Sequence, residues 1–271
     1  QEYTLSATGG NDKMNYYSSL GYLDETGIIL YSGYKRITGR VKADYQAKKW
    51  LKLGANVSYT NSTSISNPNA GTSSNETNPA YFTTYIAPIY PVYIRKVGAD
   101  GKPYIPLDEY GHLSYDYART AKDSYANVVR PFLSGNPLGA NYYNKSNSYG
   151  NQLNATFTAS VNFTSFLKLD VNSNVVLGQT DKSNYDTMFY GPKVSVGGEL
   201  TKSSTTAIRT NNSQTLTFFK DFGKHNISVL AGHEYYKTTT RYLDATARGL
   251  FSEDVLELNA AADKTTNSSY T

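Results

Sequence analysis

The histidines and carboxylates of this sequence are the side chains that could support catalysis or bind a metal ion, but their spacing favours neither. His233-Glu234 begins like a zinc-binding helix, but no second histidine follows at the required spacing, and the segment alternates like a strand. The three histidines are scattered along the chain. Asp108 and Glu109 are adjacent, so on an extended chain they point in opposite directions and do not form a glycosidase pair. We therefore expect no catalytic residue, no metal ion and no cofactor, and we do not expect an enzyme.

Aromatic side chains offer a different chemistry, and they are concentrated between residues 61 and 149. Tyrosine accounts for 26 of the 271 residues. Tyrosine rings stack on the C–H faces of sugars and on peptide planes, and their hydroxyl groups form hydrogen bonds. The alternative is that most of these rings form a small core of the segment itself. The candidate contacts to a substrate or to a covering partner are Tyr85, Tyr90, Tyr93 and Tyr110.

The segments that flank this aromatic region alternate with a period of two, which indicates β-strands. Residues 37–45 alternate apolar or small side chains with polar ones, and the pattern resumes after the short turn at 47–49. Such a pair of runs predicts a hairpin, and the unit recurs along the chain. The expected strands lie at about residues 2–8, 14–23, 36–46, 50–60, 150–163, 167–178, 210–221 and 226–237.

The connections between these eight expected strands alternate in length. The short ones are at 9–13, 47–49, 164–166 and 222–225. The long ones are at about 24–35, 61–149 and 179–208. Successive antiparallel strands place alternate connections at opposite ends, so the short turns should share one end, as in outer-membrane barrels. A strand of eleven residues such as 36–46, tilted by ~45°, spans roughly 25 Å, which matches the apolar band of such barrels.

The sequence therefore predicts an all-β fold, a transmembrane antiparallel up-and-down β-barrel in which residues 61–149 form a large external loop. The net charge of +4 gives no reason to expect binding to nucleic acid. No apolar run approaches the ~20 residues of a membrane helix. A soluble β-sandwich or lipocalin-like barrel, with its apolar face inward, is the alternative. Asn, Ser, Thr and Gly on the polar face argue against a solvated outer surface rich in Lys and Glu.

The alternation also assigns side chains to the two faces of the wall. The residues expected to face lipid are Val41, Val57, Phe157, Val161 and Val171. Those expected to face the lumen are Lys42, Asn56, Thr158 and Asn172. Arg40, Lys42 and Asp44 share the polar face, where they either pair with a plug inside the lumen or are simply solvated.

Six segments carry a resemblance to a known family: Tyr16–Ile28, Ser32–Arg36, Trp50–Tyr59, Ala87–Tyr93, Asn136–Pro137 and Ala247–Ser252. They resemble the SusC/RagA family of TonB-dependent outer-membrane transporters of Bacteroidota. The chain begins with Gln1 rather than Met, and its last residues have the composition of a loop. We therefore expect a piece of a longer protein in which residues 1–271 are part of the barrel domain and the plug domain is absent.

The resemblance implies a barrel of roughly 22 strands around the plug, in the outer membrane of a Gram-negative bacterium. On that scale this chain supplies about a third of the barrel. The implied partners are outer-membrane lipid, a SusD-like surface lipoprotein that closes over the barrel, the plug domain of the same chain, and the TonB complex. A dimer of transporter–lipoprotein pairs is also allowed. The implied function is import of oligosaccharides. The alternatives are import of oligopeptides, as in RagA-like members, and a surface glycan-binding β protein without transport.

Overall fold

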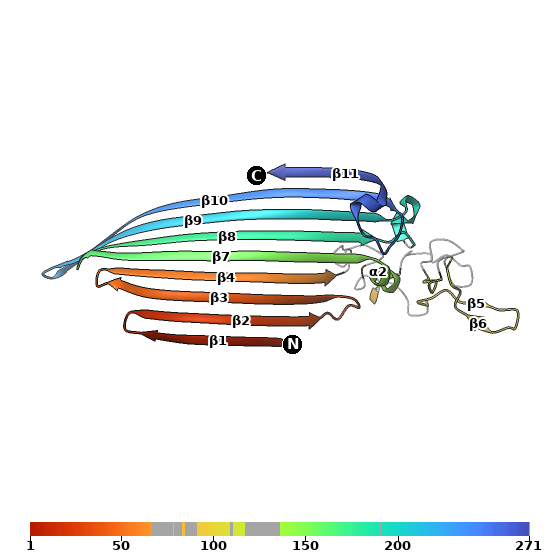
Figure 1. Ribbon diagram of the computed structural model, residues 1–271, viewed down its shortest axis with the longest axis horizontal. Helices are drawn as coiled ribbons and strands as arrows, with labels where there is room; N and C mark the ends of the chain where they lie inside the picture. The colour runs from red at the N-terminus through yellow and green to blue at the C-terminus, as the bar shows by residue number, and fades with distance from the viewer. Residues whose placement is uncertain are drawn as a thin grey trace.

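The computed structural model describes residues 1–66, 78, 83–84, 91–108, 111–116, 136–189 and 191–270. These residues form one antiparallel sheet of nine strands in the order β1-β2-β3-β4-β7-β8-β9-β10-β11 (Figure 1). The strands are β1 (Glu2–Asn11), β2 (Met14–Thr26), β3 (Gly33–Lys48), β4 (Leu51–Ser66), β7 (Lys145–Thr164), β8 (Leu167–Asp186), β9 (Glu199–Phe222), β10 (His225–Leu250) and β11 (Ala261–Tyr270). The other elements are the paired strands β5 (Lys96–Val97) and β6 (Pro103–Tyr104), the helix α2 (Pro137–Tyr143), and the 3-10 helices η2 (Gly191–Val196) and η3 (Leu258–Ala260).

The all-β antiparallel architecture confirms the fold class expected from the sequence, and each of the eight expected strands overlaps an observed one. The count of eight is wrong, because β11 is a ninth strand of the sheet. The strands are also longer than expected, so the connections shrink to 27–32, 67–144 and 187–198. Both errors have one cause. Most of the added residues, such as those of the first half of β9, are polar on both faces, so no regular alternation marks them as strand.

The short connections share one end of the sheet, as expected (Figure 1). The four hairpin turns, at 12–13, 49–50, 165–166 and 223–224, lie together at the left of the view. The longer connections, with α2 and the β5–β6 pair, lie at the opposite end. We call these the turn end and the loop end. No helix in the described part of the chain has both the length and the apolar character needed to cross a membrane.

The strand register separates an apolar face of the sheet from a polar one. The apolar row through Val41 continues across the sheet as Val57, Ala155, Val175, Thr210 and Lys237. The next row lies on the opposite face and consists of Lys42, Asn56, Thr156, Asn174 and Asn211. Along the apolar face, large side chains stay exposed at mid-strand; Val41 is 60% and Phe157 54% exposed. A soluble sandwich would bury these positions.

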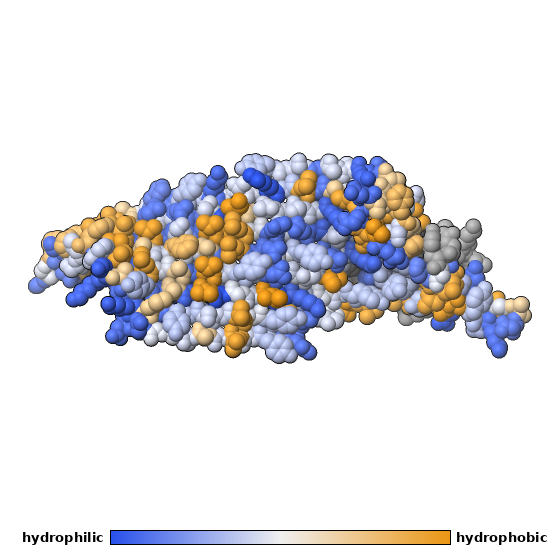
Figure 2. All heavy atoms as spheres, viewed as in Figure 1, coloured by the Kyte–Doolittle hydropathy of each residue, from blue (hydrophilic) through white to orange (hydrophobic). Residues whose placement is uncertain are grey.

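Apolar side chains gather over the turn-end part of the sheet (Figure 2). Two register rows stay apolar across four strands: Leu51, Val161, Leu169 and Leu216 form one, and Tyr59, Leu153, Leu177 and Ile208 form the other. The rows between them become polar on β9, where the Val41–Val57 row reaches Thr210. The apolar band between these two rows is therefore continuous on β4 and β7 and interrupted on β9.

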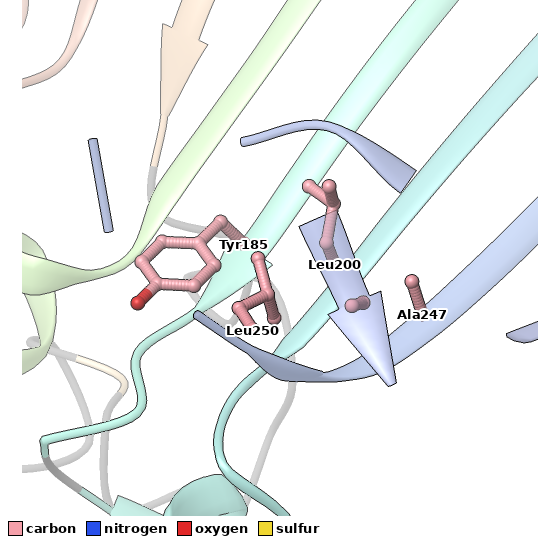
Figure 3. Packing of buried hydrophobic residues seen from close by; sticks show 5 residues of the cluster. Tyr185, Leu200, Ala247 and Leu250 are labelled. Carbon is pink, nitrogen blue, oxygen red and sulfur yellow. The ribbon is translucent and has the colours of Figure 1, made fainter. Parts of the chain in front are cut away.

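A compact apolar cluster lies at the loop end, where β8, β9, β10 and β11 contribute side chains and residues of the connection at 251–260 pack against them (Figure 3). Gly249 has φ +68° and interrupts the β10–β11 pairing. Its Cα lies so close to Gly197 that a Cβ on Gly197 would be 3.0 Å away. The cluster consists of Tyr185, Leu200, Ala247, Leu250 and Ala261, with Leu256 and Leu258 against it. The segment Ala247–Ser252, which carries part of the family resemblance, thus supplies a glycine with positive φ and two core residues.

Candidate functional site

Helix α2 begins at an asparagine that fastens the long connection between β4 and β7 to the loop end. Asn136 is the N-cap, and its Oδ1 accepts hydrogen bonds from the backbone N–H groups of Leu138 (3.1 Å) and Gly139 (3.2 Å). Its Nδ2 donates to the carbonyl oxygens of Val92 (2.7 Å) and Asp116 (3.2 Å). Proline at the first helical position suits the helix start, since it has no N–H to satisfy. One buried side chain therefore joins α2 to two separate segments of the loop.

The rings around α2 form an aromatic cluster whose centre is buried. Tyr143 is 2% exposed, and its ring centroid lies 5.9 Å from that of Tyr115, which is 9% exposed. Tyr93 packs on Tyr115 with a centroid distance of 4.8 Å. Burial raises the pKa of both Tyr115 and Tyr143 above the ordinary value, so both phenols stay neutral at physiological pH. These rings form the core of the described part of residues 91–143 at the loop end, which we call the loop layer.

Two rings at the margin of the aromatic cluster are exposed and come from different connections. Tyr31, in the β2–β3 connection, is 59% exposed, and Tyr142 on α2 is 48% exposed. Their centroids are 5.8 Å apart at an interplanar angle of 69°, so the two rings form a corner. Tyr31 has φ +64°, which is unfavourable for a side chain with a Cβ. The turn is closed by hydrogen bonds from Gly27 N–H to the Ser32 carbonyl and from Ser32 N–H to the Ile29 carbonyl.

A histidine connects the loop layer to the connection before β11. His112 Nδ1 lies 3.4 Å from Asp108 Oδ2, and its Nε2 lies 3.8 Å from Glu253 Oε1. The imidazole also packs against the rings of Tyr143 and Phe189. No group of three or more His, Cys, Asp or Glu side chains suited to a metal ion occurs among the residues that the structure describes. The arrangement therefore fastens the two connections together.

The three charged residues expected to face the lumen do share the polar face, where they contact other side chains of the sheet. Arg40 Nε donates to Asn56 Oδ1 on the neighbouring strand at 2.9 Å. Lys42 Nζ and Asp44 Oδ2 form an ion pair at 3.2 Å along β3. Lys42 and Asp44 neutralise one another at short range, whereas Arg40 is held by the neutral amide of Asn56 and keeps its positive charge.

Between its charged positions, the polar face is built from amides and hydroxyl groups. Asn174 Nδ2 donates to Asn154 Oδ1 and to Thr156 Oγ1, each at 2.8 Å. Asn211 Nδ2 donates to Glu234 Oε1 at 2.7 Å across β9 and β10. Nearer the turn end, the Ser160 hydroxyl donates to Asp170, which also pairs with a lysine on its own strand. The face can thus exchange hydrogen bonds with a neutral polar ligand without presenting a large unbalanced charge.

Of the four tyrosines selected from the sequence, only Tyr93 can be placed. It is half-buried and packs into the aromatic cluster. The other three predicted contacts, Tyr85, Tyr90 and Tyr110, lie outside the described residues. The sequence reasoning missed Tyr31 and Tyr142, which lie outside the most aromatic stretch of the loop. Asn136-Pro137 is typical of a helix start and could have predicted the position of α2. No local sequence pattern predicts that Tyr31 contacts Tyr142 on this helix.

Comparisons with known proteins agree with this architecture. The chain is 25% identical over 256 residues to TonB-dependent receptor P3 of Formosa agariphila, covering 93% of this chain and 23% of the receptor. It is 41% identical over 59 residues to TonB-dependent receptor P39 of the same organism, covering 22% of this chain and 6% of that protein. No protein-family profile matches the chain.

Solved structures extend the likeness to the fold. A structure of the RagAB peptide transporter superposes with a TM-score of 0.68 at 21% identity, covering 99% of this chain and 28% of that one. The RagAB peptide importer in its closed-closed state gives 0.64 at 21% identity over the same shares. The chain is therefore similar in sequence to TonB-dependent receptors and similar in fold to the RagAB transporter.

These similarities agree with the family resemblance noted from the sequence. The chain spans about a quarter or less of the length of the proteins that it matches. The matched structures are consistent with a nine-stranded part of a larger barrel, and the aromatic cluster then lies at its loop end.

Proposed function

We propose that this chain forms part of the barrel wall and external loops of a TonB-dependent outer-membrane importer of oligosaccharides. The observation that carries the proposal is the exposed apolar band on one face of long strands, where Val41 and Phe157 are more than half exposed at mid-strand. The lipid-facing surface of a membrane barrel carries such a band. The amide-rich opposite face then lines the lumen, and the loop end lies outside the cell.

Neutral oligosaccharides suit the polar groups on the lumenal face. Sugars offer many hydroxyl groups, which pair well with the amides of Asn154, Asn174 and Asn211. Sugars also have apolar C–H faces that stack on aromatic rings. The corner formed by Tyr31 and Tyr142 exposes such rings at the loop end. Oligopeptides are the alternative substrate, since peptide planes also stack on tyrosine.

The complete protein would work through selective binding and gated passage rather than catalysis. In this proposal the plug domain of the same chain fills the lumen, and the TonB complex supplies energy through the part that precedes this segment. A SusD-like surface lipoprotein covers the loop end, and a dimer of transporter–lipoprotein pairs is the expected assembly. The location is the outer membrane of a Gram-negative bacterium of the Bacteroidota.

Replacing both Tyr31 and Tyr142 with Ala in the complete transporter should weaken uptake of its oligosaccharide by a factor of roughly 5 to 150. Each exposed ring should contribute about 0.5–1.5 kcal/mol of stacking. Uptake can be measured with a panel of fluorescent plant and algal oligosaccharides in living cells. Tyr104→Ala is the matched control, because Tyr104 is 49% exposed on β6 but lies outside the Tyr31–Tyr142 corner.

The same experiment separates the substrate classes. A strain that takes up tri- to hexapeptides but none of the sugars would replace the glycan proposal with the oligopeptide one. A protein that binds sugars at the cell surface without any uptake would favour a glycan-binding surface protein. Unchanged uptake by the double variant would remove the tyrosine corner from recognition.

A further inference from the structure

Two cations lie on the apolar side of β10, just beyond the end of the apolar band. Ile227, Val229 and Ala231 point to that side, as the register with β9 shows. Further along the strand, Lys237 pairs with Thr210 and Arg241 pairs with Thr206, so both lie on the same side. Both residues are exposed.

The distance along the strand places these cations at the level of lipid headgroups. Lys237 is ten residues beyond Ile227 (237 − 227), and Arg241 is fourteen beyond it (241 − 227). At a rise of ~3.4 Å per residue and a tilt of ~45°, these steps correspond to heights of roughly 24 Å and 34 Å. The apolar band of a membrane barrel is about 25 Å tall. Lys237 therefore lies at its outer edge and Arg241 in the layer above.

The surroundings of the two cations suit a phosphate group. Arg241 lies over the ring of Tyr270, with its guanidinium carbon 5.5 Å from the ring centroid. Neither Lys237 nor Arg241 forms an ion pair with a carboxylate in the described part of the chain, whereas Lys42 and Arg248 do so on the polar face. Hydroxyl groups on neighbouring positions of the same face complete the surface: Thr206, Thr210, Thr239 and Ser268.

We propose that Lys237 and Arg241, with Tyr270, form a binding site for the phosphorylated headgroup of a lipid in the outer leaflet. The inference rests on the membrane location proposed above, because that location makes lipid the neighbour of this face. The two cations supply charge complementarity to the phosphate. Tyr235, two residues before Lys237, is 50% exposed on the same face and places an aromatic ring at the interface, as in the girdles of membrane barrels. The acyl chains would then lie along Ile227, Val229 and Ala231.

Native mass spectrometry of the complete transporter, purified in detergent and titrated with phosphatidic acid, tests the site. The Lys237→Gln/Arg241→Gln variant should bind the lipid about thirtyfold more weakly, because each cation near an anionic lipid surface contributes about fivefold. Arg209→Gln is the matched control. Arg209 on β9 pairs with Thr238, which follows Lys237 on β10. The side chain of Arg209 therefore lies close to the site along the strands but on the opposite face of the sheet. The control should bind the lipid like the wild type.

The outcomes separate this site from the proposed function. Equal lipid retention by the double variant and the wild type would overturn the site, even if uptake of oligosaccharides is normal. Displacement of the lipid by millimolar inorganic phosphate would also overturn it, since the surface would then be a general anion site. A wild-type protein that retains no lipid and is absent from the outer-membrane fraction would overturn both the site and the membrane location. Loss of lipid in the double variant alone, with uptake intact, is the expected result.

Discussion

Lysine at Val57 should destabilise the complete protein by about 2–4 kcal/mol, whereas lysine at Thr210 should have little effect. The two positions belong to one register row and one face of the sheet. They differ in surroundings, because the row is apolar at Val57 and polar at Thr210, which pairs with Lys237 on β10. Val57 lies near the middle of the apolar stretch of β4, and Thr210 lies on β9 six residues from Leu216 toward the loop end. A charge at the bilayer midplane is costly, and a charge beyond the band is not.

Urea-induced unfolding of the protein folded into phosphatidylcholine vesicles measures this difference. Val161→Lys serves as a second test, because Val161 lies on the apolar face near the turn end of β7. Lysine at Val161 should cost less free energy of unfolding than lysine at Val57 and more than lysine at Thr210, because Val161 lies nearer the membrane–water interface than Val57 does. Equal unfolding free energies for the Val57 and Thr210 variants would contradict the placement of Val57 inside the lipid-facing band and of Thr210 outside it. A larger cost at Thr210 than at Val57 would reverse the assignment of height.

Replacing Asn136 with Ala should cost about 2–4 kcal/mol of local stability in the loop layer. The N-cap hydrogen bonds contribute about 1 kcal/mol. The remainder comes from buried carbonyl groups that lose their donor. Asn136 is 3% exposed, so water does not readily replace those hydrogen bonds. The strands of the sheet should be unaffected, because none of the four partners of Asn136 lies on them.

Hydrogen–deuterium exchange read by mass spectrometry can follow this local change. Exchange of residues 91–116 and α2 should accelerate, while peptides from β7 and β8 serve as internal controls. Asn136→Asp keeps an acceptor for the helix N–H groups but removes the donor to the carbonyls of Val92 and Asp116. It should loosen 91–116 while α2 stays protected. Wild-type exchange rates across 91–116 in both variants would show that Asn136 does not hold the loop layer together.

The strands that cross the apolar band could be predicted from the sequence, because one apolar and one polar face produce a period of two. Residues 37–45 on β3 are an example, and the predicted faces agree with the observed register. Outside the band the same strand geometry carries polar residues on both faces. The beginning of β9 and the whole of β11 therefore gave no signal, although backbone pairing continues through them.

The loop end could be predicted only in part. The aromatic content of residues 61–149 indicated a ring-rich layer, and Tyr93 does belong to one. The contact between Tyr31 and Tyr142 depends on how two distant connections fold together, which no local pattern encodes. Asn136 shows the same limit. Its capping role follows from Asn-Pro at a helix start, but its bonds to Val92 and Asp116 are tertiary.

The assignment of one face to lipid and the other to the lumen is the central claim, and spin-label accessibility tests it most directly. This chain contains no cysteine, so single cysteines can be introduced from Arg40 to Tyr45 of β3 in the complete, membrane-embedded transporter. Spin labels at positions 41, 43 and 45 should be relaxed by lipid-soluble oxygen. Labels at positions 40, 42 and 44 should be relaxed by a water-soluble nickel complex. Where the plug packs against the wall, labels at these even positions should be relaxed by neither agent. Oxygen accessibility that peaks at the even positions, or that shows no alternation, would contradict the account.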